Sequence, residues 1–359
     1  MASPSTLPGP YNVFVPNAKS SGNLIVDFSR SINDFALLKY VQLVVSQNTL
    51  GLYYRMGLNQ RARVLDNDAA AYRWADGTRR PRPQNQAEYF SEEEFRTLQY
   101  SYYDSIGWQT KDQAAWDEQE RRSRSLAQQA MTIRTNVIQQ MLQNPANWPA
   151  SHVFDMSGAT GIPGVSSGTR LNDGTAANPV LLKVSNHVKN LVTLDTRAAV
   201  KGNDLMWVFG PTSAQALAIS QEIVELVKQN VGGLAYLNLQ GDLFKRTNYN
   251  LPNALYDNSY IIEDTVKVTS ERGLNITQTA DYSLPVGSML MLYRPNQLEG
   301  VEGGRSFSTA TCYVYGGDEM KLETKDDSFD HLTEIAITDN FTGNMTAPIT
   351  GALLLNALR

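Results

Sequence analysis

TKDQAAWDEQERRSRSLAQQAMTIRTNVIQQMLQN, residues 110–144, contains neither glycine nor proline. Thr110 and Gln113 have the spacing of a capping box, in which two side chains bond to backbone N–H groups at the start of a helix. An apolar stripe follows at helical spacing: Leu126, Ala130, Ile133, Val137 and Met141. The stretch therefore predicts one helix of roughly 33 residues, about 50 Å long. Its first half is almost wholly polar, so we expect it to lie along a surface or against a neighbour.

A charged and aromatic segment precedes this helix, at residues 61–107. Turn signals at Asp76-Gly77, Pro81 and Pro83 separate two aromatic flanks, which predicts a long two-stranded excursion with a polar tip. An isolated hairpin is marginally stable in water, so this one needs a surface to lie on. We expect its contacts with another subunit at Arg73, Trp74, Arg79, Arg80, Arg82, Glu92, Glu93 and Glu94.

The start of the chain has a different composition. Residues 1–23 are rich in proline, serine, glycine and asparagine, which is typical of an extended arm that buries no core. The next segment, FALLKYVQLVVSQNTLGL at residues 35–52, is apolar and β-branched. Its pattern fits a helix and a strand equally well.

Beyond residue 178 the pattern predicts a small α/β unit. Asn178 as N-cap and Pro179 at the first helical position begin a second helix. Its stripe is Leu181, Val184, Val188 and Leu191. DLMWVFG, residues 204–210, reads as a buried strand, and TSAQALAISQEIVELVKQNVGG as a third helix ended by Gly232-Gly233. The residues of that helix expected to face inward are Ile219, Ile223, Leu226 and Val227.

Strands are predicted in the last hundred residues. The runs at 260–268, 288–293 and 306–315 are rich in apolar and β-branched residues, and the last alternates apolar with polar positions. The C-terminal APITGALLLNALR, residues 347–359, is apolar almost to its end, so we expect it to be packed against the body.

Composition excludes several functional classes. With 359 residues, 42% of them hydrophobic and 19% charged, the chain has the composition of a globular protein with a sizeable core. The sequence contains no run of about 18 apolar residues, so it predicts no membrane span. The N-terminus lacks the pattern of a secretory signal. A net charge of −5 argues against a grip on DNA phosphates, which needs a basic face. Cys312 is the single cysteine, so neither an internal disulfide nor a cysteine zinc site is expected.

One motif raises the question of catalysis. GVSSG, residues 164–168, matches the G-x-S-x-G pattern of a hydrolase nucleophile elbow around Ser166. A working elbow needs an apolar strand before the serine and a helix after it, whereas both flanks here are rich in turn residues. The candidate bases are His152, His187 and His331. We interpret the segment as a connector and expect no catalytic residue, with a serine hydrolase using Ser166 as a remote alternative.

Cofactor and metal motifs are also missing from the sequence. The glycine-rich segment lacks the Gly-Lys-Ser/Thr ending of a phosphate-binding loop. An acidic cluster lacks the residue order of a calcium-binding loop, and we interpret it as a solvated loop: Asp318, Glu319, Glu323, Asp326, Asp327 and Asp330. We expect no cofactor and no metal site. The arginines at 79, 80 and 82 have acidic neighbours, which favours contact with a subunit over contact with nucleic acid.

The order of these elements resembles that of the major capsid proteins of tailed bacteriophages, whose fold is named after the Hong Kong 97 phage. FALLKYVQLVVSQNTLGLYYRMGLNQRARV resembles the end of the family's N-terminal arm, and AYRWADGTRRPRPQNQAEYF resembles its E-loop hairpin. LQYSYYDSIGWQTKDQAAWDEQERRSRSLAQQAMTIRTNVIQQML resembles the return into the spine helix. SSGTRLNDGTAANPVLLKVSNHVKNL and NDLMWVFGPTSAQAL are similar to the connector and A-domain, and GSMLMLYRPN and FSTATCYVY to the passage back into the P-domain.

The resemblance implies an α+β fold with five parts. These are an N-terminal arm at residues 1–60, an E-loop at 61–110, a P-domain with spine helix and connector at 111–178, an A-domain at 179–305, and P-domain strands at 306–359. It further implies a non-enzymatic coat protein that assembles as hexamers and pentamers into an icosahedral head around double-stranded DNA. Scaffolding and portal proteins are the implied partners, and whether cement proteins join them stays open. The implied location is the virion, after assembly in the host bacterial cytoplasm.

Two features depart from some members of that family. No lysine lies between Lys39 and Lys111, so the E-loop cannot supply the amine of an isopeptide bond to a neighbour, and we expect a non-covalent shell. About 23 loose residues precede the arm, so we expect a separate scaffolding protein. An encapsulin, a bacterial shell of the same fold that stores a cargo enzyme, is the nearest alternative.

Overall fold

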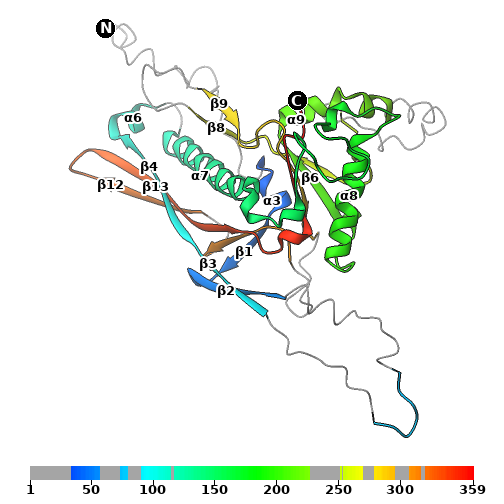
Figure 1. Cartoon of the computed structure of the whole chain (residues 1–359). Helices are drawn as coiled ribbons and strands as arrows, with labels where there is room; N and C mark the ends of the chain where they lie inside the picture. The colour runs from blue at the N-terminus through cyan, green and yellow to red at the C-terminus, as the bar shows by residue number, and fades with distance from the viewer. Residues whose placement is uncertain are drawn as a thin grey trace, which may run out of the picture.

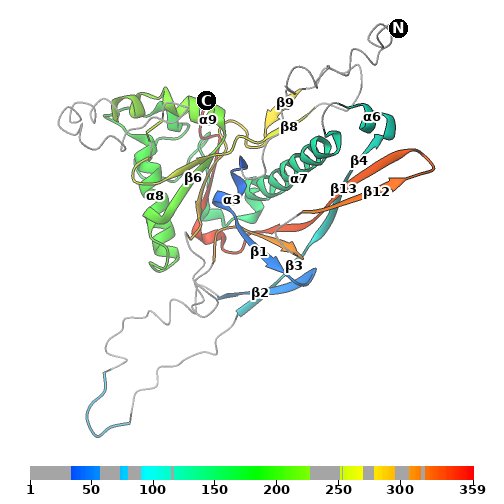
Figure 2. The same ribbon diagram turned by 180° about the vertical axis from the view of Figure 1, so that it is seen from behind.

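The computed structural model describes residues 34–56, 73–79, 90–114, 117–226, 251–252, 254–269, 279–295, 307–316 and 320–359. Two five-stranded sheets form the body, and each is covered by helices (Figure 1). A two-stranded ribbon (residues 50–56 and 90–96) and a long hairpin (residues 321–344) extend from the body in different directions, as the view from behind also shows (Figure 2). The fold is therefore a mixed α and β architecture with projections, as the sequence predicts.

The first sheet carries the long helix on one face. Its strands are β1 (Gln42–Ser46), β4 (Leu98–Gly107), β11 (Thr311–Tyr315), β12 (Lys321–Asp327) and β13 (Leu332–Asn344). The order is β1-β11-β13-β12, with β4 also paired to β13. Burial alternates along β13, because one face of this strand packs against the helix and the other faces outward. Strand β13 is thus the centre of this half of the body.

The long helix is shorter than the sequence predicts. Helix α7 (Glu118–Gln143) begins at Asp117, whose side chain accepts a hydrogen bond from the Glu120 N–H at 3.0 Å. A separate short helix, α6 (Trp108–Gln113), precedes it and ends at Ala114, which has extended backbone angles. The predicted capping box at Thr110 is wrong, because Thr110 lies inside α6. Helix α7 is about 39 Å long.

The buried face of α7 is rotated from the predicted stripe. Leu126 and Ala130 are buried as predicted, whereas the remaining three predicted positions, Ile133, Val137 and Met141, are only partly buried. The fully buried set also includes Met131, Arg134, Thr135, Ile138, Gln139 and Leu142. Apolar periodicity alone missed this face because polar residues with specific partners occupy part of it.

The second sheet lies beside helices α8 (Val180–Asp195) and α9 (Pro211–Ala218). Its order is β5 (Val153–Asp155), β14 (Ala352–Leu355), β10 (Met289–Tyr293), β6 (Leu205–Phe209) and β7 (Tyr260–Ile262). All five residues of β6 are buried, which confirms the predicted strand at 204–210. The C-terminal segment is packed as predicted, since Leu353, Leu354 and Leu358 are buried.

Helix α8 starts differently from the prediction. Its N-cap residue is Pro179, and Asn178 does not cap it with a side-chain hydrogen bond. The buried carboxylate of Glu222 accepts hydrogen bonds from the Leu181 and Leu182 N–H groups instead, at 3.0 and 3.1 Å. A carboxylate at this end also complements the helix dipole. The predicted stripe is buried at Leu181, Val184 and Val188 and partly buried at Leu191.

The predicted third helix is two helices in the structure. Helix α9 ends at Ala218, and residues 221–226 form a separate helical segment. Ile219 lies at the break and is 81% exposed, so its predicted inward position is wrong. Ile223 is buried as predicted, whereas Val227 and Gly232-Gly233 lie outside the described residues. The break lets Glu222 turn inward to the start of α8.

The remaining described elements are small. The ambiguous segment at 35–52 contains both structures, because a single turn of helix, α3 (Leu37–Tyr40), leads directly into β1. Strand β2 (Leu50–Met56) pairs with β3 (Phe90–Arg96), and β8 (Val266–Val268) pairs with β9 (Ala280–Tyr282). The predicted run at 260–268 is thus divided between β7 and β8. Short 3-10 turns occupy Pro145–Asn147, Ala150–His152, Leu171–Asp173, Gly202–Asp204 and Pro348–Thr350.

Candidate inter-subunit surfaces

The β2–β3 ribbon is held to the body by aromatic stacking. The Phe95 ring lies 4.0 Å from the Tyr313 ring of β11 with an interplanar angle of 5°. The Tyr53 ring of β2 is also stacked near Tyr313, at 6.2 Å. A Cβ on Gly51 would lie 2.4 Å from Cζ of Phe95, so only glycine leaves room for this ring. Burial raises the pKa of the Tyr313 hydroxyl to about 12. This inner face anchors the ribbon.

The outer face of the ribbon, Leu50, Leu52 and Tyr54 with Glu92, Glu94 and Arg96, is exposed. The three β2 side chains are 56%, 49% and 62% exposed. They lie opposite Arg96, Glu94 and Glu92, respectively. Side chains on opposite residues of an antiparallel pair share a face, so an apolar row lies beside a charged row. An exposed apolar row with a charged border is typical of an interaction surface.

The tip of the predicted E-loop, residues 73–79 and named the E-loop tip below, is a tight turn far from the ribbon. The Thr78 N–H and hydroxyl both donate to the Ala75 carbonyl, at 3.1 and 2.7 Å, and the Trp74 indole N–H donates to the Thr78 carbonyl at 2.7 Å. Gly77 has a φ of 77°, which suits the turn. Trp74 is 51% exposed, and Arg73 and Arg79 on either side of the turn are exposed as well. Both views place this tip away from the body (Figures 1 and 2).

The structure divides the predicted contact residues into two groups. Arg73, Trp74 and Arg79 lie on the E-loop tip, whereas Glu92 and Glu94 lie on the outer face of the ribbon. Glu93 points to the inner face, where its carboxylate accepts a hydrogen bond from the Tyr53 hydroxyl. The remaining two predicted residues, Arg80 and Arg82, lie outside the described residues. The tip and the ribbon are not brought together within one chain.

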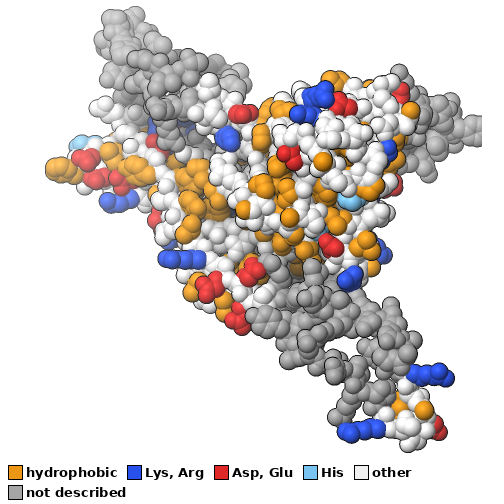
Figure 3. Space-filling view, viewed as in Figure 1, with side chains coloured by type: hydrophobic (Ala, Val, Ile, Leu, Met, Phe, Trp, Pro, Cys, Tyr) orange, Lys and Arg blue, Asp and Glu red, His pale blue; other side chains and the backbone are white. Residues whose placement is uncertain are grey.

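A further projection was missed by the sequence prediction. The turn of the β12–β13 hairpin holds Phe329, which is 91% exposed. The Asp327 side chain accepts hydrogen bonds from the Phe329 and Asp330 N–H groups at 2.9 and 3.3 Å, and these bonds lower its pKa. The projecting end carries hydrophobic and acidic side chains together (Figure 3). A lone aromatic residue within an acidic turn was the available signal, and the acidic residues obscured it.

The turn end of this hairpin is fixed by contacts with α6, and the neighbouring strand β4 is fixed by α7. The Trp108 N–H donates to the His331 carbonyl at 2.9 Å, and the two rings meet edge to face at 5.0 Å. Arg122 of α7 binds both oxygens of the Asp104 carboxylate on β4, at 2.8 and 2.9 Å, and also reaches Glu118. The hairpin is therefore presented on a rigid support.

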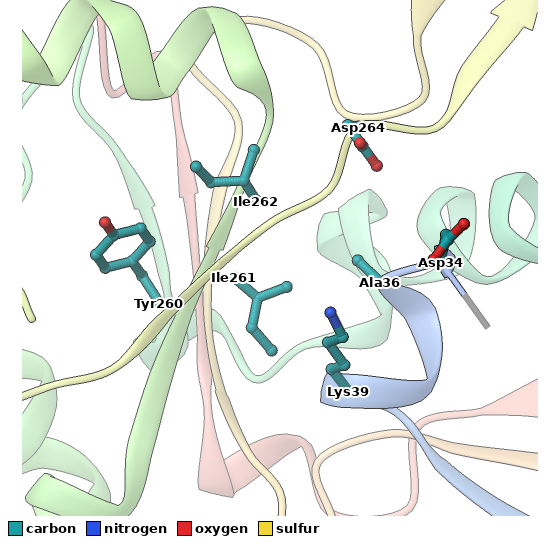
Figure 4. A pocket seen from close by; sticks show the side chains of 7 residues that line it. All are labelled: Asp34, Ala36, Lys39, Tyr260, Ile261, Ile262 and Asp264. Atoms are coloured by element: carbon teal, nitrogen blue, oxygen red, sulfur yellow. The ribbon is translucent and has the colours of Figure 1, made fainter. Parts of the chain in front are cut away.

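One pocket of about 330 Å³ lies between α3 and β7. Its lining is Asp34, Ala36, Lys39, Tyr260, Ile261, Ile262 and Asp264 (Figure 4). Beside it the buried Glu263 carboxylate accepts hydrogen bonds from the Tyr40 hydroxyl and from the N–H and hydroxyl of Thr265. Tyr40 and Thr265 are themselves buried. The polar groups of the lining are the carboxylates of Asp34 and Asp264, the amine of Lys39 and the hydroxyl of Tyr260.

The candidate catalytic residues do not form a hydrolytic site. Ser166 is exposed in a connector, between Gly164 and Gly168 with φ values of 76° and 74°, and not between a strand and a helix. His152 is buried, and its ring nitrogens contact the Gly351 carbonyl and the Asp195 carboxylate at 2.7 and 2.8 Å. His187 packs edge to face on Phe154, and His331 lies in the β12–β13 turn.

Within the described ranges, no three or more histidine, cysteine, aspartate or glutamate side chains are grouped so as to hold a metal ion. Of the acidic cluster, Asp318 and Glu319 lie outside those ranges. The part of the chain that the structure describes also holds no helix with the length and apolar character of a membrane span.

Known proteins resemble this chain in structure and not in sequence. No family model and no curated protein sequence matches it. A phage-related protein from Bordetella bronchiseptica matches with a TM-score of 0.59 and 11% identity, covering 91% of this chain and 93% of that one. The capsid of the cyanophage P-SCSP1u matches with a TM-score of 0.53 and 11% identity, over 93% and 91% of the two chains.

A third similar structure is the SrpI encapsulin of Synechococcus elongatus, with a TM-score of 0.52, 8% identity, and coverage of 95% and 94%. In all three cases the match covers more than 90% of this chain. At these identities the likeness concerns the fold. The chain has the Hong Kong 97-like fold of phage capsid proteins.

Proposed function

We propose that this chain is the major capsid protein of a tailed double-stranded DNA bacteriophage, which assembles as hexamers and pentamers into an icosahedral head. The observation that carries the proposal is the set of exposed projections on a capsid fold. The outer face of the ribbon, the E-loop tip and Phe329 all place large apolar side chains in solvent, away from the chain's own core. Surfaces of this kind are typical of subunits that complete their burial against neighbours.

The five parts of the fold have separate roles in this proposal. The A-domain, residues 179–305, surrounds the axis of each hexamer or pentamer, and the P-domain, residues 111–178 and 306–359, forms the rest of the wall. The projecting parts of the E-loop, residues 61–110, and of the arm, residues 1–60, lie over adjacent subunits, whereas strands β4 and β1 within these ranges belong to the first sheet. Strand β2 pairs with β3, so the ribbon at the base of the E-loop begins at Leu50. Each contact between two subunits can be weak and the shell still be stable, because a closed lattice forms many such contacts at once.

Electron microscopy of the expressed and purified chain tests this proposal. We expect closed shells or ring-shaped hexamers and pentamers, whose proportion rises with protein concentration. Co-expression with a separate scaffolding protein is expected to narrow the range of shell sizes, whereas uniform shells from this chain alone would argue against a separate scaffold. A protein that stays monomeric at every concentration contradicts the proposal.

An encapsulin is the second candidate, and the likeness to the SrpI encapsulin favours it specifically. Both candidates predict shells, so the contents decide between them. A phage head holds double-stranded DNA after packaging through a portal, whereas an encapsulin holds a protein cargo. Nuclease-protected DNA in particles from the native source supports the phage head. Protein cargo without DNA supports the encapsulin.

The proposed shell is held together without covalent bonds between subunits. No lysine lies between Lys39 and Lys111, so the E-loop has no amine to form an isopeptide bond. Boiled particles are therefore expected to run as a single monomer band on denaturing electrophoresis. A ladder of bands above the monomer would contradict this part of the proposal.

A further inference from the structure

We propose that the E-loop tip of one subunit binds the outer face of the β2–β3 ribbon of a second copy of this chain. This inference rests on the proposed function, since it names the partner surface that the projecting tip meets in the shell. The two surfaces lie apart within one chain, and each exposes large side chains to solvent. They fit each other in charge and in composition.

The charges of the two surfaces are complementary. The tip presents two arginines, Arg73 and Arg79, with one acidic residue, Asp76. The ribbon presents two glutamates, Glu92 and Glu94, with one basic residue, Arg96. Within the described part of the chain none of the four residues Arg73, Arg79, Glu92 and Glu94 has an ion-pair partner closer than 4 Å. Opposite charges on two surfaces of this kind favour and orient their association.

The tip has the composition of a binding hot spot. Tryptophan and arginine are the residues most enriched where a few side chains carry most of the binding energy of an interface. Trp74 is 51% exposed, yet its indole N–H is already bonded to Thr78 within the turn, so its ring is held in one orientation. A side chain fixed in advance loses little conformational freedom on binding. The tip therefore presents a fixed aromatic ring to a partner, with Arg73 and Arg79 on either side of the turn that carries it.

The ribbon offers the matching surface. Leu52 and Tyr54 lie directly opposite Glu94 and Glu92, so an apolar row and a pair of carboxylates run side by side. The Tyr313 stack behind them holds the ribbon in place, which makes this face firm enough to receive a ring. A tip on one copy and a ribbon on the next form a head-to-tail contact. Contacts of this type propagate around a ring until it closes.

A charge-swap experiment tests the pairing in the full-length chain. The tip variant is R73E/R79E, the ribbon variant is E92R/E94R, and the third variant combines all four changes. Each half-swap is expected to lower the assembled fraction at least about tenfold, because like charges then meet across the contact. The combined variant is expected to return to within about threefold of the wild type. The matched control K321E/E323K exchanges an exposed ion pair on β12 and is expected to assemble normally.

A cysteine cross-link gives a readout that does not depend on shells. Chains with A75C on the tip are mixed with chains carrying L52C on the ribbon and then oxidised; native Cys312 is buried. A disulfide-linked dimer that needs both variants supports the inference, even where only small oligomers form. Normal assembly of both half-swap variants, or assembled particles without the mixed cross-link, overturns it. Absence of any assembly in the wild type overturns the proposed function instead.

Discussion

Arg134 of α7 and Asp339 of β13 form an ion pair whose side chains are only 2% and 1% exposed. The guanidinium is bidentate, with Nε at 3.0 Å and Nη2 at 2.6 Å from the two carboxylate oxygens. It also lies over the Phe341 ring, 5.5 Å from its centroid. Two charges taken out of water need good geometry to be tolerated, and this pair has it. The pair fixes the long helix to the centre of the first sheet.

Removal of one partner is expected to be costly. D339N leaves the Arg134 charge buried without a counter-charge, and such changes lower the free energy of unfolding by about 3–5 kcal/mol. Chemical denaturation of dissociated subunits measures the loss. The double variant R134M/D339L removes both charges and fills the same space with apolar side chains. Its free energy of unfolding is therefore expected to be much closer to that of the wild type. A D339N protein as stable as the wild type would contradict this account of the helix–sheet contact.

Stability is expected to depend on pH through Glu263. Burial, with a smaller contribution from the charge of Asp264, raises the pKa of this carboxyl despite its hydrogen bonds from Tyr40 and Thr265. A raised pKa means that the folded chain holds the proton more tightly than the unfolded chain does. The stabilisation is therefore complete below the unfolded pKa of about 4.3 and is lost as pH rises through the folded pKa.

The variant E263Q tests this linkage, because glutamine resembles the protonated acid at every pH. Its unfolding free energy is expected to lack the part of the wild-type decrease that occurs as pH rises above about 4.3. Denaturant titrations at several pH values compare the two proteins. Parallel pH profiles for wild type and E263Q would contradict the assignment of this group.

The ribbon is expected to depend on a glycine. G51A places a methyl group against the Phe95 ring, which then has to leave its stack on Tyr313. Overpacking of this kind costs about 1–3 kcal/mol. Hydrogen exchange along β2 and β3 measures the loosening. G158A is the control, because a Cβ on Gly158 meets no atom within 4 Å, and similar exchange in both variants would contradict the role of Gly51.

Phe329 is expected to matter for assembly and not for the stability of the subunit. It is 91% exposed, so F329S is expected to change the unfolding free energy of the dissociated subunit by less than about 0.5 kcal/mol. The same change removes an apolar anchor from the hairpin turn, and sedimentation is expected to show fewer assembled particles. F329Y keeps the ring and is expected to restore them. Equal assembly of F329S and the wild type would refute a role in contacts between subunits.

The order of elements could be predicted from the sequence, because most of them are defined by local signals. The buried strand at 205–209 is a continuous apolar run, and the glycine-free stretch before Pro145 marks a long helix. Exact boundaries could not be predicted where a distant partner decides them. Glu222 caps α8 from about forty residues away, and Asp117 starts α7 seven residues after the predicted cap.

The contact surfaces were predicted only in part for a related reason. Arginine, tryptophan and glutamate near a turn signal an exposed hairpin, and all the predicted contact residues that the structure describes are exposed except for Glu93. The side on which each glutamate lies depends on pairing with β2, which the sequence did not reveal. Arg134 and Gln139 look like surface residues, but their buried partners lie on β13 and α3.

The oligomeric state of the purified full-length chain tests the central claim most directly. Electron microscopy combined with sedimentation should find the chain in rings and closed walls, with the E-loop tip, residues 73–79, protected from proteolysis only once subunits have joined. A stable monomer at high concentration, with that same segment already protected against its own body, would contradict the account.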